Sequence, residues 1–113
     1  QSGLPIERLL VRHRQRLVVV RLDDVSRVSA EEKYVRLHTE MGSLLHRMPI
    51  GELAQRLDVS RFVRIQRSEI VNLRHVVSMA TRAHGDAVVQ LRDGTELMAS
   101  RHYRSSWLPR LRR

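Results

Sequence analysis

The sequence predicts one mostly β domain, in which short strands are joined by tight turns and two short helices complete the core. Its 113 residues provide for a single modest core, because a chain of about this size buries roughly two-thirds of its surface on folding. Apolar residues make up 42% of the chain but aromatic residues only 4%. Valine, leucine and isoleucine must therefore supply most of the burial, and these residues suit a β-rich core.

The first half of the chain alternates aliphatic runs with charged turns, which is the pattern of consecutive strands. The turns are basic at 12–16 and acidic at 23–24, and glycine at position 42 marks a hairpin. The strands expected from this pattern are 9–11, 17–21, 25–29, 34–38 and 43–47.

One segment in the middle of the chain has helical periodicity instead. Its apolar residues recur at i, i+3, i+4 and i+7, namely Ile50, Leu53, Ala54 and Leu57. Pro49 stands where the first helical residue is expected, and polar residues occupy the other face. Residues 49–57 are therefore predicted to form a short amphipathic helix that packs its apolar stripe on the core.

The second half returns to strands separated by turn signals at 85–86 and 93–94. The expected strands are 62–65, 70–72, 76–80, 87–91 and 97–99. At the second turn, a three-residue loop pairs Val89 with Leu97. This loop places Gly94 in the left-handed conformation, which glycine adopts with the least strain.

A second helix is predicted at the C-terminal end of the chain. Ser100 provides an N-cap, and Pro109 is expected to disturb the helix. The residues that share its apolar face are Tyr103, Trp107, Leu108 and Leu111.

The charge balance points to a polyanionic partner. There are 21 basic and 12 acidic residues, which gives a net charge of +9. Lys33 is the single lysine, so almost every positive charge is a planar guanidinium that can donate two hydrogen bonds to a phosphate or a guanine. Nucleic acid is therefore the first candidate ligand.

The sequence argues against an enzyme and against a bound metal or cofactor. It contains no cysteine, its six histidines lack a metal-binding or nucleophile-activating spacing, and its five glycines are scattered. No apolar run could cross a bilayer and no signal peptide is visible, so we expect a cytoplasmic protein. Because the chain begins at Gln1, we interpret it as a fragment in which residues 4–113 form one domain and an upstream regulatory domain is absent.

Three segments place hydrogen-bonding side chains on turns or strand ends: 29–39, 62–72 and 99–104. Arginine can read guanine and glutamine can read adenine in a major groove, whereas lysine, serine and tyrosine suit phosphates. For some of these residues a purely structural role is an open alternative to DNA contact. Arg64 and Arg67 fit the charged face of an edge strand, and Tyr34 fits a packed aromatic.

At these segments the sequence resembles the LytTR family, the DNA-binding domains at the C-terminus of many bacterial response regulators. The family pattern runs through Tyr-Val-x-Leu-His-Thr, a short helix, Phe-x-Arg-Ile-His-Arg-Ser-x-Ile-Val-Asn-Leu, a Gly-Asp hairpin and Ser-Arg-Arg-Tyr. The matching segments follow in the same order and spacing: 34–39, 52–57, 62–73, 85–94 and 100–103. The likeness extends over about residues 9–108.

The resemblance implies a fold and a mode of binding. The expected fold is an elongated arrangement of antiparallel β-sheets with one short amphipathic helix and a C-terminal helix. Loops and strand ends, and not a recognition helix, would read successive major grooves of double-stranded promoter DNA. Family members commonly occupy two direct repeats, so a homodimer on DNA is expected for the full-length protein of a two-component system.

By position, the resemblance also implies roles for individual residues. The expected base-reading residues are Lys33, Tyr34, Gln66, Arg67 and Arg101. The expected phosphate-binding or supporting residues are Arg64, Ser68, Asn72, Ser100, His102 and Arg104.

Three positions depart from the family pattern. Gln66 stands in place of histidine, which changes the base edge that could be read, and His102 stands in place of arginine. Glu69 replaces an aromatic residue, and we expect it to place a carboxylate near DNA or to remove a packed ring, unless it turns toward Arg67 or Arg74.

The competing interpretation is a basic β-rich module that binds RNA or an acidic protein. It is weakened by the shortage of aromatic residues for stacking unpaired bases. The four aromatic residues are Tyr34, Phe62, Tyr103 and Trp107, of which Phe62 and Trp107 are expected to be buried.

Overall fold

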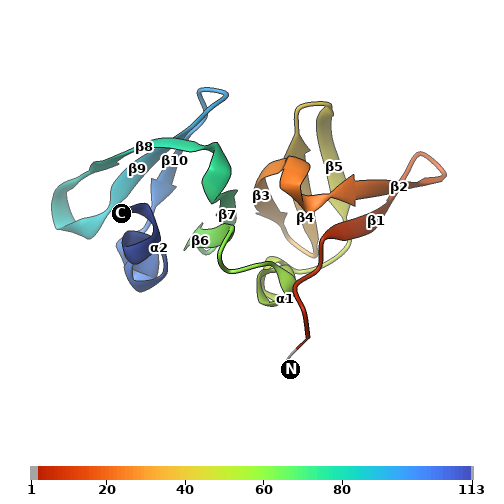
Figure 1. Ribbon diagram of the computed structural model, residues 1–113, viewed down its shortest axis with the longest axis horizontal. Coiled ribbons are helices and arrows are strands. Elements are labelled where there is room, and N and C mark those ends of the chain that lie inside the picture. Colours follow the sequence, from red (N-terminus) through yellow and green to blue (C-terminus); the bar gives the residue numbers. More distant parts are fainter. Residues whose placement is uncertain (1–2, 113) are drawn as a thin grey trace.

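The computed structural model describes residues 3–112, so Arg113, the last residue of the predicted domain, lies outside the described residues. Ten strands within this range form three antiparallel sheets, and two helices lie beside them (Figure 1). The molecule measures 46 × 33 × 25 Å. The predicted fold class, elongated and mostly β, is therefore confirmed.

The three sheets follow the predicted order of strands. The strand expected at 87–91 has the predicted bounds, the one expected at 43–47 is shifted by one residue, and the others are one to three residues longer than expected. The first sheet is the hairpin β1 (Arg8–His13) and β2 (Arg16–Arg21). The central sheet has the order β5-β4-β3-β7-β6, formed by β3 (Val25–Glu31), β4 (Tyr34–Thr39), β5 (Gly42–His46), β6 (Phe62–Gln66) and β7 (Glu69–Asn72). The third has the order β10-β9-β8, formed by β8 (Val76–Thr81), β9 (Ala87–Leu91) and β10 (Glu96–Ala99).

Short 3₁₀ turns connect several of these strands. They are η1 (Leu22–Asp24), η2 (Leu73–His75), η3 (Ala83–Gly85) and η4 (Arg101–Tyr103). The predicted register at the last hairpin is confirmed, because Val89 pairs with Leu97 and Gly94 has a φ of +92°. The loop closes where the N–H of Leu91 donates to the carbonyl of Thr95 at 2.9 Å.

The first helix, α1, spans Ile50–Arg56. Pro49 precedes it in an extended conformation (ψ 146°) and occupies the N-cap position, one residue before the position that we predicted. Leu53 is fully buried and Ile50 nearly so, which confirms that the apolar stripe packs on the core.

The second helix differs from its prediction at both ends. Ser100 accepts a hydrogen bond from the N–H of His102 and so caps η4, whereas α2 itself spans Arg104–Leu111. The helix continues through Pro109. Proline removes the hydrogen bond to the carbonyl four residues earlier, here that of the exposed Ser105, where water can take its place.

Two hydrophobic cores exist where the sequence predicted one. The first lies between β1–β2, the central sheet and α1, and the second between the third sheet, α2 and the β6–β7 hairpin. The hairpin contributes to both, since neighbouring strand residues point to opposite faces. Phe62 and Ile70 belong to the first core, and Val63, Ile65 and Val71 to the second.

Neither helix in residues 3–112 has the length and apolar character needed to span a bilayer.

Candidate nucleic-acid interface

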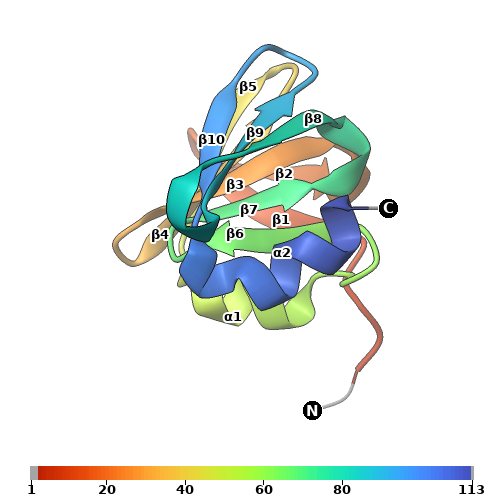
Figure 2. The same cartoon turned by 90° about the vertical axis from the view of Figure 1, so that its left-hand side faces the viewer.

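The three polar segments lie on one side of the molecule. Figure 2 shows the β3–β4 turn, the β6–β7 turn and the start of the C-terminal helical region along its left side, together with the β8–β9 connection. This arrangement follows from the topology, because β3, β6 and β8 each run toward this side before the chain turns back. Residues distant in sequence are thereby gathered on one surface.

Backbone hydrogen bonds fix the three segments relative to one another. The N–H of Ala30, at the end of β3, donates to the carbonyl of Ser68 in the β6–β7 turn at 2.9 Å. The N–H of Ser100 donates to the carbonyl of Ile65 at 2.8 Å. The β6–β7 turn is therefore bonded on one side to the first segment and on the other to the third.

The β3–β4 turn presents Lys33 and Tyr34 to solvent. Tyr34 is 39% exposed, so its ring lies at the surface and not in either core. The guanidinium of Arg47 lies 5.6 Å from the centre of its ring and donates to Oη at 3.5 Å. Sequence reasoning missed Arg47, although extending the Val35–His46 pairing by one residue would have set it opposite Tyr34.

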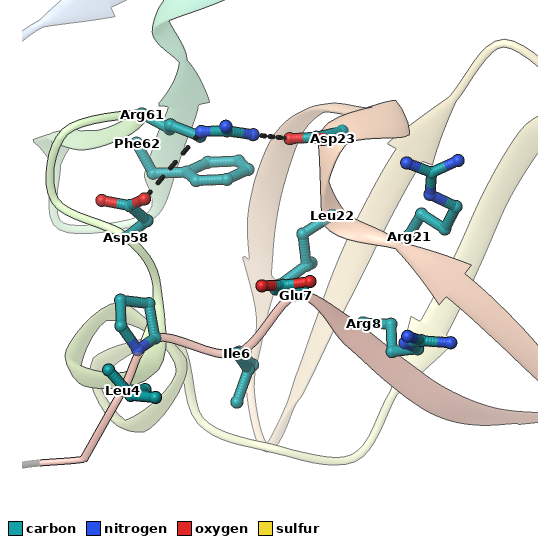
Figure 3. Close-up of a pocket in the computed structure, with 11 residues that line it drawn as sticks. Leu4, Ile6, Glu7, Arg8, Arg21, Leu22, Asp23, Asp58, Arg61 and Phe62 are labelled. Atoms are coloured by element: carbon teal, nitrogen blue, oxygen red, sulfur yellow. Dashed lines mark hydrogen bonds and ion pairs between the residues drawn. The ribbon is translucent and has the colours of Figure 1, made fainter.

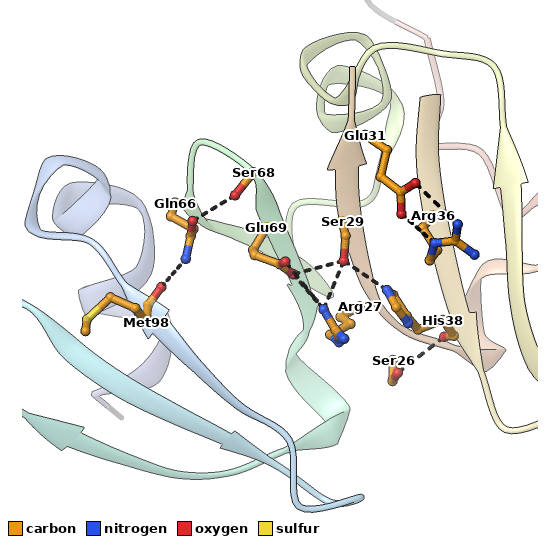
Figure 4. Close-up of polar contacts among 10 residues, drawn as sticks. All are labelled: Ser26, Arg27, Ser29, Glu31, Arg36, His38, Gln66, Ser68, Glu69 and Met98. Atoms are coloured by element: carbon orange, nitrogen blue, oxygen red, sulfur yellow. Dashed lines mark hydrogen bonds and ion pairs between the residues drawn. The ribbon is translucent and has the colours of Figure 1, made fainter. Parts of the chain in front are cut away.

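Gln66 uses both ends of its amide within the domain (Figure 4). Its Nε2 donates to the carbonyl of Met98 at 2.8 Å, and its Oε1 accepts from the hydroxyl of Ser68 at 2.8 Å. Adenine readout needs both amide groups. The geometry therefore favours a role in which Gln66 holds the turn to β10, in preference to the predicted base contact.

Arg67 and Arg64 have different environments although both belong to the β6–β7 hairpin. Arg67 is exposed at the turn. Arg64 is partly buried: its guanidinium lies 5.4 Å from the ring centre of Tyr103, and Nη2 donates to the carbonyl of Arg67 at 2.5 Å. β6 is indeed an edge strand, but the side chain of Arg64 connects the turn to η4 and is not a solvated edge charge.

The third segment holds Arg101 in a defined backbone position. The N–H of Arg101 donates to Oδ1 of Asp86 at 2.8 Å. Gly85 has a φ of +89°, and a Cβ placed there would come within 3.4 Å of the Cβ of Arg101. The side chains of Arg101, His102 and Arg104 are exposed, whereas the Ser100 hydroxyl is engaged as the η4 cap.

The β8–β9 connection adds basic residues that the sequence did not single out. Arg82 and His84 are exposed beside η4, and His84 has a φ of +67°. The sequence did not mark this turn as part of the site, because a positive φ at a residue other than glycine becomes visible only in the structure.

Asn72 does not reach this surface. It is 1% exposed, its Nδ2 donates to the carbonyl of Val25 at 2.9 Å, and its Oδ1 accepts from the N–H of Arg74 at 3.0 Å. Two roles were expected for Asn72, phosphate contact or structural support of the binding residues. Its buried position is compatible with support and not with phosphate contact.

Replacing Asn72 with alanine is expected to lower the free energy of unfolding by about 1–3 kcal/mol, because the buried carbonyl of Val25 and the part-buried N–H of Arg74 lose their partners. Urea denaturation measures this change. DNA affinity, corrected for the folded fraction, should stay at the wild-type value. A stable variant with weakened binding would contradict the supporting role.

Comparisons with known proteins agree with this geometry. A model of the family described as the LytTr DNA-binding domain matches residues 15–109. The chain belongs to the LytTR family of DNA-binding domains. A solved structure with the same fold is the LytTr DNA-binding domain of a Bacillus cereus protein described as a methyl-accepting/DNA response regulator. Its TM-score is 0.84 at 21% identity, over 94% of this chain and 97% of that chain.

A curated relative has a similar sequence over part of the domain. The CO-responsive transcriptional regulator RcoM of Rhodospirillum rubrum is 37% identical over 62 residues, which is 55% of this chain and 26% of the relative. The matched part of this chain thus covers about a quarter of the length of that regulator.

The exposed charges on the candidate surface of this LytTR domain are mostly positive. The exposed basic residues are Lys33, Arg47, Arg67, Arg82, Arg101 and Arg104. Within residues 3–112 none of them forms an ion pair with a carboxylate. Two nearby carboxylates are bound within the domain, Glu31 to Arg36 at 2.5 Å and Glu69 to Arg27 at 3.1 Å, whereas Glu32, beside Lys33 in the β3–β4 turn, is exposed. The unpaired guanidinium groups are consequently available to an anionic ligand.

Glu69 faces Arg27, as Figure 4 shows, and its side-chain hydrogen bonds are with Arg27 and Ser29 and not with Arg67 or Arg74. Glu69 pairs with Ser29 across the sheet, which brings its carboxylate beside the side chains of β3. Burial raises the pKa of Glu69, and the nearby Arg27 opposes this rise. The acidic replacement of the family's aromatic residue is accommodated inside a polar cluster and not on the candidate DNA surface.

His38 belongs to the same cluster, with Nε2 at 2.9 Å from the Ser29 hydroxyl. Burial, followed by the charges of Arg27 and Arg36, lowers the pKa of His38 to about 4. The imidazole is therefore neutral at pH 7 and adds no positive charge to the surface.

Replacing His38 with glutamine is expected to flatten the pH dependence of stability between about pH 6.5 and pH 4. In this window the unfolded chain binds a proton at His38 and the folded domain does not, so the wild-type free energy of unfolding falls as the pH falls. Urea denaturation at pH 7, 5.5 and 4 compares the two proteins. The exposed His84→Gln provides the control, and equal slopes for wild type and His38→Gln would refute the assignment.

A cavity of about 600 Å³ lies elsewhere, between the N-terminal segment and the α1–β6 loop (Figure 3). Of the three arginines that line it, Arg61 is bonded to Asp23 and lies 3.9 Å from a carboxylate oxygen of Asp58. Both carboxylates have lowered pKa values, that of Asp23 mainly through Arg61 and that of Asp58 mainly through Ser60. The cavity thus holds a neutralised ion-pair network, unlike the surface described above.

Proposed function

We propose that this LytTR domain recognises specific sequences in double-stranded promoter DNA by inserting its turns into the major groove. The observation that carries the proposal is the set of unpaired, exposed arginines on turns whose backbones are hydrogen-bonded to one another. Base readout requires donors on a fixed backbone, and the backbone bond between Ile65 and Ser100, close to Arg67 and Arg101 in the chain, supports this role.

Residue roles follow from exposure. Arg67 and Arg101 read bases, with Lys33 and Tyr34 as the third reading element. The exposed His102 and Arg104 contact phosphates, together with the hydroxyl of Ser100, whose cap bond leaves its proton free to donate. The Ser68 hydroxyl donates to Gln66 and so has a supporting role. Gln66 and Arg64 hold the reading turns in place.

The molecular context is also a proposal. The long axis of 46 Å exceeds one turn of B-DNA, about 34–36 Å, so one domain covers a half-site of about one turn. Two copies of the full-length regulator would then occupy a direct repeat as a homodimer on promoter DNA in the bacterial cytoplasm. No catalytic role is assigned to this domain.

Binding to single-stranded RNA is less consistent with the aromatic residues. Phe62 and Trp107 are 6% and 1% exposed, and the ring of Tyr103 is covered by Arg64. Tyr34 is exposed, but the guanidinium of Arg47 lies over its ring as well. One partly covered ring is too little for the usual stacking platform.

Selection of duplexes from a randomised DNA pool at about 0.15 M salt tests the proposal, because non-specific phosphate binding weakens at this salt while base readout persists. We expect one enriched motif, repeated at a spacing of about 10 base pairs for the dimeric protein. Single-stranded RNA should compete poorly with the selected duplex. A pool without enrichment, or RNA as the better ligand, would overturn the proposal.

A further inference from the structure

The β1–β2 hairpin ends in a turn of unusual composition. His13 pairs with Arg16, so Arg14 and Gln15 form a two-residue loop. Both residues are left-handed, with φ values of 51° and 67°. Two-residue hairpin turns of this kind favour Asn-Gly or similar pairs, because other side chains are strained there. Arg14 therefore has a left-handed backbone conformation that arginine does not favour.

The same hairpin is strongly basic. Residues 8–21 contain five arginines and no carboxylate. Arg12, Arg14 and Arg16, which surround the turn, are exposed. In the described part of the chain none of the three forms an ion pair. These three arginines thus form a cluster of positive charge that no carboxylate of the described domain neutralises.

The tip lies on the side of the candidate DNA surface, at the far end of the molecule from η4. Figure 1 shows the β1–β2 turn at the right-hand end of the long axis. In Figure 2, β1 runs from the side of the N-terminal segment toward the side that carries the β3–β4 and β6–β7 turns. Along the long axis the surface therefore continues from η4, through the β6–β7 and β3–β4 turns, to this hairpin.

We propose that the tip defined by Arg12, Arg14 and Arg16 binds phosphates of duplex DNA outside the base pairs that the reading turns contact, on the flank next to the β3–β4 turn. This inference rests on the proposed DNA-binding function. Guanidinium groups on a protruding turn suit phosphates, which carry no sequence information. Arg12 and Arg14 also precede the residues that the family model matches.

The test uses a variant that removes charge while improving the turn: Arg14→Asn and Gln15→Gly, combined with Arg16→Gln. Asn-Gly suits the left-handed loop, so this variant should unfold at a temperature no lower than wild type. The matched control is Arg74→Gln with Arg92→Gln, which removes two exposed charges near η2, at the other end of β7.

We expect the tip variant to reduce the slope of log affinity against log salt concentration by about 0.9 for each lost phosphate contact. This corresponds to about a fivefold loss per contact at 0.15 M salt. The selected motif should be unchanged, and the control should keep the wild-type slope. Removing the duplex flank next to the β3–β4 turn should abolish the difference between wild type and tip variant, whereas removing the other flank should not.

An unchanged slope for the tip variant, or an equal change in the control, would overturn the inference. Failure of the proposed function is a separate result: no motif would be selected by the wild-type protein. The tip can still be judged in that case, because its effect on the salt slope is measured equally well with a duplex of random sequence.

Discussion

Replacing Trp107 with alanine is expected to destabilise the domain by about 3–5 kcal/mol, the range for large aromatic residues in a core. Trp107 is 1% exposed and is the largest residue of the second core. Its indole Nε1 also donates to the carbonyl of Ser100 at 2.8 Å. The substitution therefore opens a cavity and removes one of the two hydrogen bonds that the Ser100 carbonyl accepts, the other coming from the N–H of Tyr103 at 2.9 Å. Urea denaturation measures the loss.

Trp107→Phe separates the two contributions. It retains most of the apolar contact but not the indole hydrogen bond, so the expected loss is nearer 1–2 kcal/mol. Because Ser100 begins η4, this variant should also weaken specific DNA binding more than its folded fraction explains. If Trp107→Ala lost less than about 1 kcal/mol, the second core would not depend on this residue as the structure indicates.

Alanine at Arg67 or at Arg101 is expected to weaken binding to the selected duplex by about 1–3 kcal/mol and to weaken binding to random duplex much less. Both side chains are exposed at rigid turns and can donate two hydrogen bonds to guanine. Titration of labelled duplexes at one fixed salt concentration gives both affinities. The ratio of the two losses measures base readout directly.

Two further variants make the result specific. Lysine at position 101 keeps the charge but not the planar pair of donors, so it should recover binding to random duplex without recovering specificity. Arg74→Ala removes an exposed arginine near the opposite end of β7 and should change neither affinity by more than a few tenths of a kcal/mol. Equal losses on both duplexes for Arg67→Ala and Arg101→Ala would contradict base reading.

Local features of the chain were predictable because their causes lie within a few residues. The left-handed Gly94 and the Val89–Leu97 pairing follow from one turn and the strands beside it. The α1 helix follows from the spacing of its apolar residues. The LytTR resemblance extended these local predictions to the whole fold, since its motifs recur in register over most of the chain.

The environments of the site residues were harder to predict from the sequence, because they depend on contacts between distant segments. Gln66 bonds to Met98, 32 residues away, and Glu69 bonds to Arg27, 42 residues away. Asn72 is buried against Val25, 47 residues away. Each of these polar residues stands in a segment that was expected to contact DNA. In the structure, each is turned into the domain by a partner on another strand.

The sequence alone therefore determined the strand and helix pattern, the excess of arginine and the family resemblance, because periodicity, turn chemistry and charge are local or additive properties. Only the tertiary structure decided that there are two cores, which arginines are free and which polar residues hold the turns. Those outcomes depend on which face of a strand another sheet covers. Alternation along a strand defines two faces, but the packing of the β6–β7 hairpin between both cores decides what each face contacts.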